Sequence, residues 1–201
     1  MRRAGDEAVD RWLGIRTTGL VTYEELEFDA ARGDRPYQGT NWLALLWLHH
    51  VLRQFGPTPE ESFVDFGAGK GRVVALAATF PFGSALGVEL SPSLAQVARE
   101  NVKRGRPPRH GARVDVVEGD MGTFPIPDDL AVAFIYNTSQ GPAFTAAAEA
   151  IRASLERRPR RFLLLYVNPA MHDHLLEMGF RLVRRARVVN ARVYAYAPAS
   201  R

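Results

Sequence analysis

The fold is decided by the stretch Phe63-Val64-Asp65-Phe66-Gly67-Ala68-Gly69-Lys70-Gly71-Arg72. A short apolar strand runs into glycines and then into a helix, so backbone N–H groups and the positive helix end face a common point. A dinucleotide fingerprint requires its third glycine at position 72, where this chain has Arg72. Asp65 adds a carboxylate that suits a ligand with an ammonium group or hydroxyls better than a pyrophosphate. Taken alone, the stretch is also compatible with a turn that only packs the first helix on the sheet.

Outward from this stretch, apolar segments of strand length alternate with segments of helical periodicity. We expect strands at residues 62–66, 85–89, 114–118, 131–136 and 162–167. We expect helices at residues 72–80, from Ser91-Pro92 onward, at 141–157 and at 170–178. The alternation predicts a doubly wound α/β fold, with a parallel sheet covered on both faces. Residues 180–189 and 192–197 predict a terminal hairpin, which places one antiparallel strand at the edge of the sheet.

The segment before the first strand is interpreted as a helical cap. Thr40 or Asn41 can cap a helix whose apolar residues follow the i, i+3, i+4, i+7 spacing, and Gly56 ends it. The apolar positions of this helix are Trp42, Leu45, Leu46, His49 and Leu52. We therefore divide the chain into a cap at residues 1–60 and a ligand-binding domain at residues 61–201.

Composition narrows the class of protein. The 201 residues include no cysteine, which excludes disulfides, thiolate metal sites and a cysteine nucleophile. The first residues lack the apolar run of a signal peptide, and no apolar run approaches the ~20 residues that span a bilayer, so we expect a cytoplasmic protein without membrane contact. The net charge of +4 comes almost entirely from arginine, and no basic run is interleaved with aromatic residues. Nucleic acid is therefore a minor option as a partner.

Two further acids follow the next two strands. Glu89 ends the second strand, where an acid can accept hydrogen bonds from both hydroxyls of a ribose. Asp120 follows the third strand and can accept from an adenine amino group, with Met121 against the ring. One such acid is usually a solvated turn residue. Three of them at the carboxyl ends of successive strands, Asp65 included, outline the crevice in which open α/β sheets bind ligands.

Together, Asp65 to Gly71, Gly87-Val88-Glu89 and Gly119-Asp120-Met121 resemble the class I methyltransferases that use S-adenosylmethionine. The resemblance covers about residues 60–200, including the hairpin, and implies a Rossmann-like methyltransferase sheet. It implies that the glycine loop and Asp65 hold the methionine moiety, Glu89 the ribose, and Asp120 with Met121 the adenine. The positions implied to contact the cofactor are Tyr37, Thr40, Asp65, Gly67, Ala68, Gly69, Gly71, Glu89, Leu90, Asp120, Met121 and Asn137.

The chain is similar in more detail to small bacterial methyltransferases with an Asp-x-Gly-x-Gly-Lys-Gly-Arg loop. Their Tyr-x-x-Thr before the core is Tyr37-Gln38-Gly39-Thr40 here, and their later Tyr-x-Asn-Pro is Tyr166-Val167-Asn168-Pro169. Protein-lysine methyltransferases of the Dot1-like and mitochondrial c-subunit types also resemble it in the loop and the segment before it. The resemblance implies that Tyr37 and Thr40 lie over the methionine end of the cofactor.

Asn137, which follows the fourth strand, stands where such enzymes orient the methyl acceptor. Its amide can accept a hydrogen bond from an amine or a hydroxyl. Relatives often have a proline at the next position, where this chain has Thr138. A general base is needed only if the acceptor is protonated at neutral pH or is a hydroxyl, and the candidates are His49, His50 and Tyr136.

We therefore expect a methyltransferase that transfers a methyl group from S-adenosylmethionine to an N or O acceptor on a small molecule, with S-adenosylhomocysteine as product. A protein lysine is the alternative acceptor. A protein that binds the cofactor but has lost or changed the transfer chemistry is kept open by Thr138, whereas Arg72 and the hairpin disfavour a nicotinamide oxidoreductase. No metal is expected, because His172 and His174 are two residues apart on a helix and do not face each other.

Overall fold

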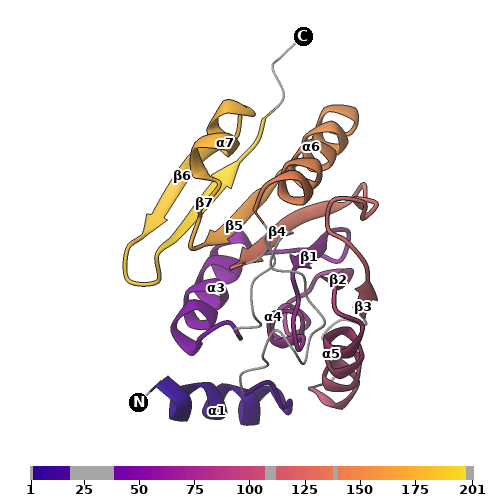
Figure 1. Cartoon of the computed structure of the whole chain (residues 1–201), viewed down its shortest axis with the longest axis vertical. Helices are drawn as coiled ribbons and strands as arrows, with labels where there is room; N and C mark the ends of the chain where they lie inside the picture. Colours follow the sequence, from indigo (N-terminus) through magenta and orange to yellow (C-terminus); the bar gives the residue numbers. More distant parts are fainter. Residues whose placement is uncertain (1, 19–38, 107–111, 138–139, 198–201) are drawn as a thin grey trace.

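The structure, a computed structural model, describes residues 2–18, 39–106, 112–137 and 140–197. Its seven strands form one sheet in the order β3-β2-β1-β4-β5-β7-β6 (Figure 1). The strands are β1 (Ser62–Phe66), β2 (Ser84–Glu89), β3 (Arg113–Glu118), β4 (Leu130–Tyr136), β5 (Leu163–Val167), β6 (Arg181–Ala186) and β7 (Ala191–Ala195). The helices are α1 (Arg2–Leu13), α3 (Trp42–Phe55), α4 (Arg72–Ala77), α5 (Pro92–Arg104), α6 (Pro142–Arg157) and α7 (His172–Glu177). The predicted α/β architecture is confirmed.

The chain winds outward from β1 in both directions. β2 and β3 follow parallel on one side, and β4 and β5 follow parallel on the other. The predicted hairpin is present, but its antiparallel strand, β7, lies one position in from the edge, between β5 and β6. The reason is that α7 crosses over before β6, which therefore remains parallel to β5, and β7 returns into the gap between them. The order reverses between β1 and β4, which is the switch point where open α/β sheets bind their ligands.

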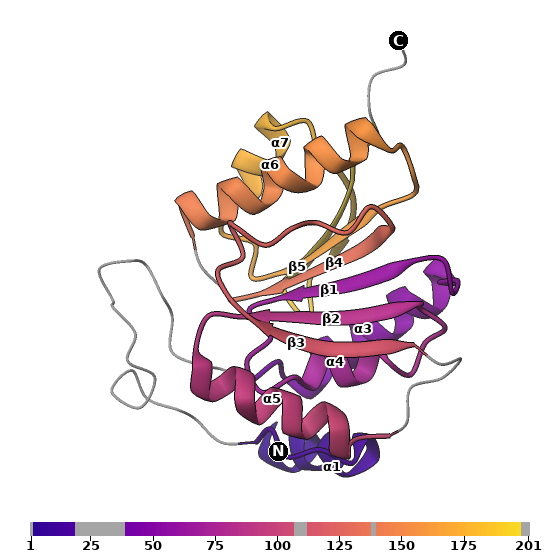
Figure 2. The same ribbon diagram turned by 90° about the vertical axis from the view of Figure 1, so that its right-hand side faces the viewer.

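Helices cover both faces of the sheet, as Figure 2 shows, with α6 and α7 on one side and α1, α4 and α5 on the other. Two apolar cores result. One holds side chains of α3, α4 and α5 with Phe63 and Phe134, and the other holds side chains of α6 and α7 with Val64 and Phe66. Successive residues of β1 thus serve opposite cores, as the pleat of a strand requires. In the described part of the chain, no helix is long and apolar enough to span a bilayer.

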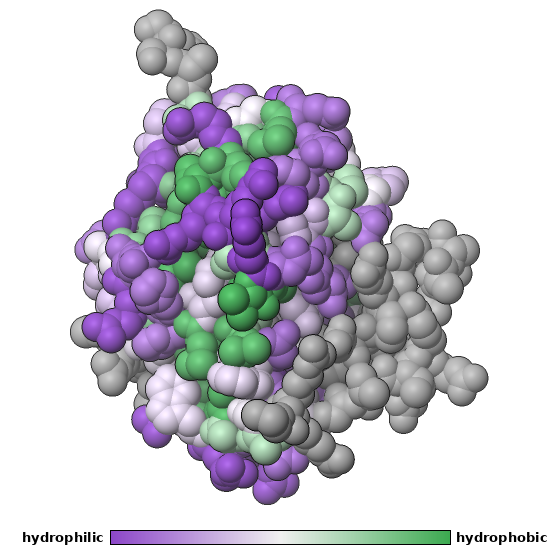
Figure 3. Space-filling view, turned by 90° about the vertical axis from the view of Figure 1, so that its left-hand side faces the viewer, coloured by the Kyte–Doolittle hydropathy of each residue, from purple (hydrophilic) through white to green (hydrophobic). Residues whose placement is uncertain are grey.

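The apolar stripe of α3 differs slightly from the predicted one. The residues buried on this helix are Ala44, Leu45, Leu48, Val51 and Leu52. Leu46, which we expected in the stripe, is 54% exposed, because it lies on the side of α3 turned away from the sheet. The face of the molecule that carries α3 and the hairpin accordingly shows apolar surface among hydrophilic side chains (Figure 3).

Local residue chemistry sets the helix ends. The Asn41 side chain accepts a hydrogen bond from Ala44 N at 3.0 Å and caps α3, and Gly56 ends the helix with φ 60°. Of the two predicted caps, Asn41 is therefore the one used. Ser91 caps α5, and Pro92 follows at its first position, where its missing N–H costs nothing.

Helix α1 packs against the start of α3. Asp6 Oδ1 accepts a hydrogen bond from Trp42 N at 2.8 Å, so a carboxylate faces the positive end of α3. A Cβ added to Gly5 would lie 2.5 Å from the Trp42 ring, so the two helices approach closely at this point. Leu48 and Leu52 of α3 belong to the same core as the sheet. The division of the chain at residue 60 stays a prediction.

Candidate functional site

The glycine loop lies flat against β2. Gly67 N and Ala68 N both donate to the Val88 carbonyl, at 2.9 and 3.0 Å. Gly67, Gly69 and Gly71 have φ values of 80°, 55° and 81°, which side chains with a Cβ rarely adopt. A Cβ at Gly87 would lie 2.7 Å from the Ala68 Cβ, so a glycine on β2 is what lets the loop come this close.

Glu89 connects the glycine loop to the start of α5 through hydrogen bonds. Its side chain is 5% exposed. Gly69 N donates to its Oε2 at 2.6 Å and Ser91 N donates to its Oε1 at 3.0 Å. Charge-assisted hydrogen bonds of this kind are the stronger ones in proteins. Both oxygens of the Glu89 carboxylate are therefore held in place at the end of β2.

Asp65 is the second carboxylate under the loop. It is 3% exposed, and no group in the described parts of the chain donates a hydrogen bond to its carboxylate. Its pKa is raised well above the ordinary value of an aspartate, first by burial and then by the charge of Glu89. A buried carboxylate beside another acid is stabilised by a cation with N–H groups. This position is therefore suited to a positively charged part of a ligand.

The end of β3 continues the same edge of the sheet. Gly119 N donates to the Glu89 carbonyl at 2.9 Å, and the exposed Asp120 follows it. Asp120 Oδ1 accepts a hydrogen bond from Gly122 N at 2.7 Å, which fixes the carboxylate in a turn. Met121 is buried in the core on the α6 side, and Leu90 is partly exposed beside Glu89. Asp65, Glu89 and Asp120 thus follow one edge, as we predicted from their places at the strand ends.

The end of β4 places Tyr136 and Asn137 beside the glycine loop. Phe66 pairs with Ile135, so Asn137, just after the end of β4, and Ala68, in the loop after β1, each stand two residues beyond this pair. Tyr136 is 9% exposed and packs in the core on the α3 and α4 side. Asn137 has φ 45°, a left-handed conformation that asparagine tolerates better than other residues with a Cβ.

Sequence reasoning missed the role of Arg72. Its guanidinium is buried, donates to Thr17 Oγ1, and donates through Nη1 to the Thr40 carbonyl at 2.7 Å. It also forms ion pairs with Asp10 at 3.0 Å and Asp6 at 3.2 Å. Arg72, the first residue of α4, thereby holds α1 and Thr40 next to the glycine loop. A buried arginine needs acidic partners, but these stand more than 60 residues earlier in the chain.

A family model described as a methyltransferase domain matches residues 63–158. The matched stretch begins on β1, includes the glycine loop and ends one residue after α6. Residues 63–158 of this chain are therefore a methyltransferase domain. The methyltransferase family, the fold class, the enzyme class and S-adenosylmethionine as cofactor, all predicted from the sequence, are confirmed.

Solved structures of methyltransferases share the fold. The glycopeptide N-methyltransferase MtfA, complexed with sinefungin, has 13% identity and a TM-score of 0.61 over 77% of this chain and 87% of its own. A SAM-dependent methyltransferase from Aquifex aeolicus has 16% identity and a TM-score of 0.53 over 74% and 87%. The methyltransferase domain of bacterial CtHen1 has 13% identity and a TM-score of 0.53 over 77% and 97%. No protein of curated function matches this sequence.

The charge and burial of Asp65 show whether the residues of the site match the charged groups of the cofactor. S-adenosylmethionine carries an ammonium group, a sulfonium and ribose hydroxyls. The Asp65 carboxylate lacks a hydrogen-bond donor among the described residues, and the Glu89 carboxylate stands beside it at the glycine loop. Two neighbouring acids suit a ligand that carries positive charge and hydroxyl groups. The residues therefore fit the cofactor of the methyltransferase family.

Of the remaining predicted site residues, Tyr37 lies outside the described residues and His49 lies away from this group. His49 packs edge-on against Phe80, with ring centroids 5.3 Å apart. Because Phe80 follows α4 and the glycine loop precedes it, His49 lies near the opposite end of that helix from the loop. Burial, and then the charges of Arg53 and His50, lower the pKa of His49. Thr40, in contrast, is placed beside the loop through Arg72.

The described residues contain no group of three side chains suited to a metal ion. His172 Nδ1 instead lies 2.8 Å from the Tyr194 hydroxyl, and His174 Nε2 lies 3.0 Å from Thr145 Oγ1. Each histidine therefore joins α7 to a different neighbouring element.

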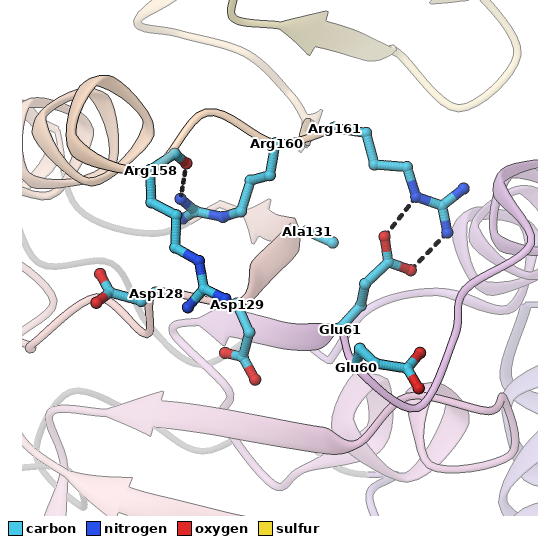
Figure 4. A pocket seen from close by; sticks show the side chains of 8 residues that line it. All are labelled: Glu60, Glu61, Asp128, Asp129, Ala131, Arg158, Arg160 and Arg161. Atoms are coloured by element: carbon cyan, nitrogen blue, oxygen red, sulfur yellow. Dashed lines mark hydrogen bonds and ion pairs between the residues drawn. The ribbon is translucent and has the colours of Figure 1, made fainter.

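A hollow with charged walls lies at the opposite edge of the methyltransferase sheet (Figure 4). Its lining residues are Glu60, Glu61, Asp128, Asp129, Ala131, Arg158, Arg160 and Arg161. Arg161 pairs with Glu61 and donates to the carbonyls of Phe55 and Gly56 at 3.0 and 2.8 Å, so it binds the negative end of α3. Arg160 donates to backbone carbonyls as well. These contacts give the hollow a structural role at the amino ends of β1, β4 and β5.

Proposed function

We propose that this enzyme transfers a methyl group from S-adenosylmethionine to a nitrogen or oxygen atom of a small-molecule acceptor. The observation that carries the proposal is the buried Asp65 beside Glu89, next to the glycine loop and Asn137. This arrangement supports the proposal of a site for a cationic cofactor beside a polar amide that contacts the acceptor.

We assign the binding roles as follows. Asp65 pairs with the ammonium group of the cofactor, and the glycine loop supports the methionine moiety through its backbone. Glu89, already oriented by Gly69 N and Ser91 N, accepts hydrogen bonds from the ribose hydroxyls. Leu90 and Asp120 flank the adenine, and Met121 supports this end of the site from the core. The support for these roles is the position of each side chain at the carboxyl ends of β1, β2 and β3.

The cofactor supplies a methyl group on a sulfonium, which is already a strong electrophile. The protein therefore mainly aligns the reactants, and alignment at about 3 Å can contribute several kcal/mol to catalysis. We assign this role to Asn137, whose amide orients the nucleophilic atom of the acceptor. Tyr136, in its phenolate form, is the candidate base that takes the proton from a hydroxyl or ammonium acceptor.

The burial of Tyr136 favours a small acceptor. Tyr136 is 9% exposed, so an acceptor needs a narrow reactive group to contact its hydroxyl. A lysine side chain, which is long and unbranched, satisfies the same requirement and is the second candidate.

We also propose a cytoplasmic location, because a chain without cysteine suits a reducing compartment.

The test combines binding with turnover. We expect calorimetry to show binding of S-adenosylmethionine and S-adenosylhomocysteine but not of NAD. Release of S-adenosylhomocysteine is then measured with panels of small amines, phenols and alcohols, and with lysine-containing peptides. Turnover with a small acceptor that is lost in Asn137→Ala, at unchanged cofactor affinity, supports the proposal. Turnover with the peptides alone makes the protein-lysine function the right one, and binding without any turnover points to a protein that has lost transfer.

A further inference from the structure

Three asparagines form a row across the carboxyl ends of β4 and β5 and the turn before β7. Tyr136 pairs with Val167, and Val167 pairs with Ala191. The residues that come next along this edge of the sheet are Asn137, Asn168 and Asn190. The register of the strands therefore brings together three residues that are 31 and 22 positions apart in the sequence.

Hydrogen bonds connect the row in one direction. Asn190 Nδ2 donates to Asn168 Oδ1 at 2.9 Å, and Asn168 Nδ2 donates to Asn137 Oδ1 at 2.9 Å. Asn168 N donates to the Asn190 carbonyl at 2.8 Å, which fixes the backbone at the same place. The side-chain oxygens of Asn137 and Asn168 thus each accept a hydrogen bond from the next asparagine of the row, the one farther from the glycine loop.

The three residues also share an unusual backbone. Asn137, Asn168 and Asn190 have φ values of 45°, 53° and 47°, and they are the residues other than glycine with positive φ in the described parts of the chain. Asparagine is among the few side chains that tolerate this conformation. Strained backbone of this kind is concentrated at functional sites, where the surrounding structure holds it in place. The backbone geometry and the hydrogen bonds therefore single out the same three positions.

We propose that Asn168, supported by Asn190, is a positioning residue that fixes the orientation of the Asn137 amide toward the methyl acceptor. This inference rests on the role proposed above for Asn137. The two ends of an asparagine amide have nearly the same shape and opposite hydrogen-bonding character, so the partner decides which end points where. Asn168 Nδ2 can only donate, so Asn137 must turn its oxygen toward it. The orientation of Asn168 is set in the same way by Asn190.

The proposal makes the polarity of Asn168 a determinant of acceptor specificity. With asparagine at this position, the Asn137 oxygen accepts from Asn168 Nδ2 with one lone pair and keeps the second lone pair to accept from an amine or hydroxyl of the acceptor. An aspartate there could only accept, so Asn137 would have to rotate its amide and turn its NH₂ group toward β5. An acceptor that matches the amide of the wild-type enzyme would then meet the opposite polarity.

Two variants of Asn168 distinguish the effect of its side-chain amide from the effect of its backbone conformation. Asn168→Gly removes the side chain and retains a residue that tolerates φ 53°, so we expect it to fold. Asn168→Asp keeps the shape and the tolerance for positive φ but reverses the hydrogen-bonding polarity. Asn190→Gly is the matched variant at the exposed end of the row and should have a smaller effect.

The first measurement is NMR of protein labelled with ¹³C and ¹⁵N at asparagine, with S-adenosylhomocysteine bound. We expect the Asn137 ¹³Cγ resonance to shift in Asn168→Gly, and its ¹⁵Nδ2 group to gain a hydrogen bond in Asn168→Asp. The affinity for S-adenosylhomocysteine, measured by calorimetry, should stay within twofold of wild type. Turnover with the best acceptor of the panel should fall at least tenfold in kcat for both variants, and less for Asn190→Gly.

An unchanged Asn137 resonance in both variants would overturn the proposal, as would wild-type kcat in both. Failure of the proposed function is a different result. In that case Asn137→Ala itself retains turnover, whereas failure of this inference alone leaves Asn137→Ala inactive and Asn168→Gly active.

Discussion

Asp65 and Glu89 show how the same functional group, a carboxylate, serves two purposes at one site. The Glu89 carboxylate is held by two backbone N–H groups and is therefore stabilised as an anion. Asp65 has no such support from the described residues, and its pKa is raised by burial and by Glu89. The protein thus keeps one acid oriented and the other in need of a cation, and the proposed cofactor provides that cation.

Replacing Asp65 should weaken binding and stabilise the fold. We expect Asp65→Asn to lower the affinity for S-adenosylmethionine at least tenfold, about 1.4 kcal/mol, because the neutral amide loses the attraction for an ammonium group. Removal of the buried charge should raise the Tm of the protein without cofactor by about 2–4 °C per kcal/mol gained. Calorimetry and thermal unfolding measure the two effects. Asp128→Asn, an exposed acid at the opposite edge, is the control, and equal effects of both variants would contradict the assignment.

The raised pKa of Asp65 predicts a pH dependence of binding. The unfolded chain ionises this residue near its ordinary pKa of about 3.9, whereas the folded protein resists ionisation to a higher pH. Stability without cofactor should therefore fall as the pH rises through this interval, and cofactor affinity should rise over the same interval, with release of a proton. Calorimetry in buffers of different ionisation enthalpy measures that proton. An affinity independent of pH, or proton release that persists in Asp65→Asn, would contradict the prediction.

At the scale of elements, the glycine loop depends on β2 as much as on its own glycines. A Cβ at Gly87 would meet Ala68 Cβ at 2.7 Å and a methyl group of Val74 at 2.9 Å. We expect Gly87→Ala to cost about 1–3 kcal/mol of stability and to weaken cofactor binding, because the loop must move away from β2. Urea unfolding and calorimetry measure the two changes. Gly119→Ala, whose Cβ would meet no atom within 4 Å, is the matched control, and a similar loss in both variants would argue against this explanation.

Arg72 joins α1 and α3 to α4. Its removal leaves the buried Asp10 without a cation, so we expect Arg72→Ala to lower the free energy of unfolding by about 3–5 kcal/mol. Arg157→Ala, which breaks an exposed pair with Asp128 at 3.6 Å, should change it by about 1 kcal/mol or less. Urea unfolding of both variants makes the comparison. A loss for Arg72→Ala as small as that of the control would mean that the buried network contributes little.

The parts of the fold that the sequence could predict are those written in local patterns. The glycine loop, the strand that precedes it and Pro92 at the start of α5 are short-range signals, and the structure has them where we expected them. The partners of Arg72 and the row of Asn137 and Asn168 depend on residues brought together by strand order and register. A single sequence carries no local signal for such pairs. His49 shows the same limit, because periodicity predicted its apolar side but not its neighbour Phe80.

On the scale of the whole molecule, the two edges of the sheet have different tasks. The carboxyl edge carries Asp65, Glu89 and Asn137, and the amino edge carries the charged hollow in which Arg161 binds Glu61 and the end of α3. Residues with a proposed chemical role thus lie at the first edge, and structural ion pairs close the second. The parallel pairing of β1 to β5 brings their carboxyl ends to one edge, and the reversal of strand order between β1 and β4 marks the ligand-binding position on that edge.

The central claim is that the carboxyl ends of β1, β2 and β3 hold S-adenosylmethionine. A crystal structure of the complex with S-adenosylhomocysteine tests it most directly. We predict that the ribose hydroxyls bind Glu89, that the ammonium group binds Asp65 and that the adenine lies beside Asp120. A ligand bound away from these three carboxylates, or a ribose held without Glu89, would contradict it.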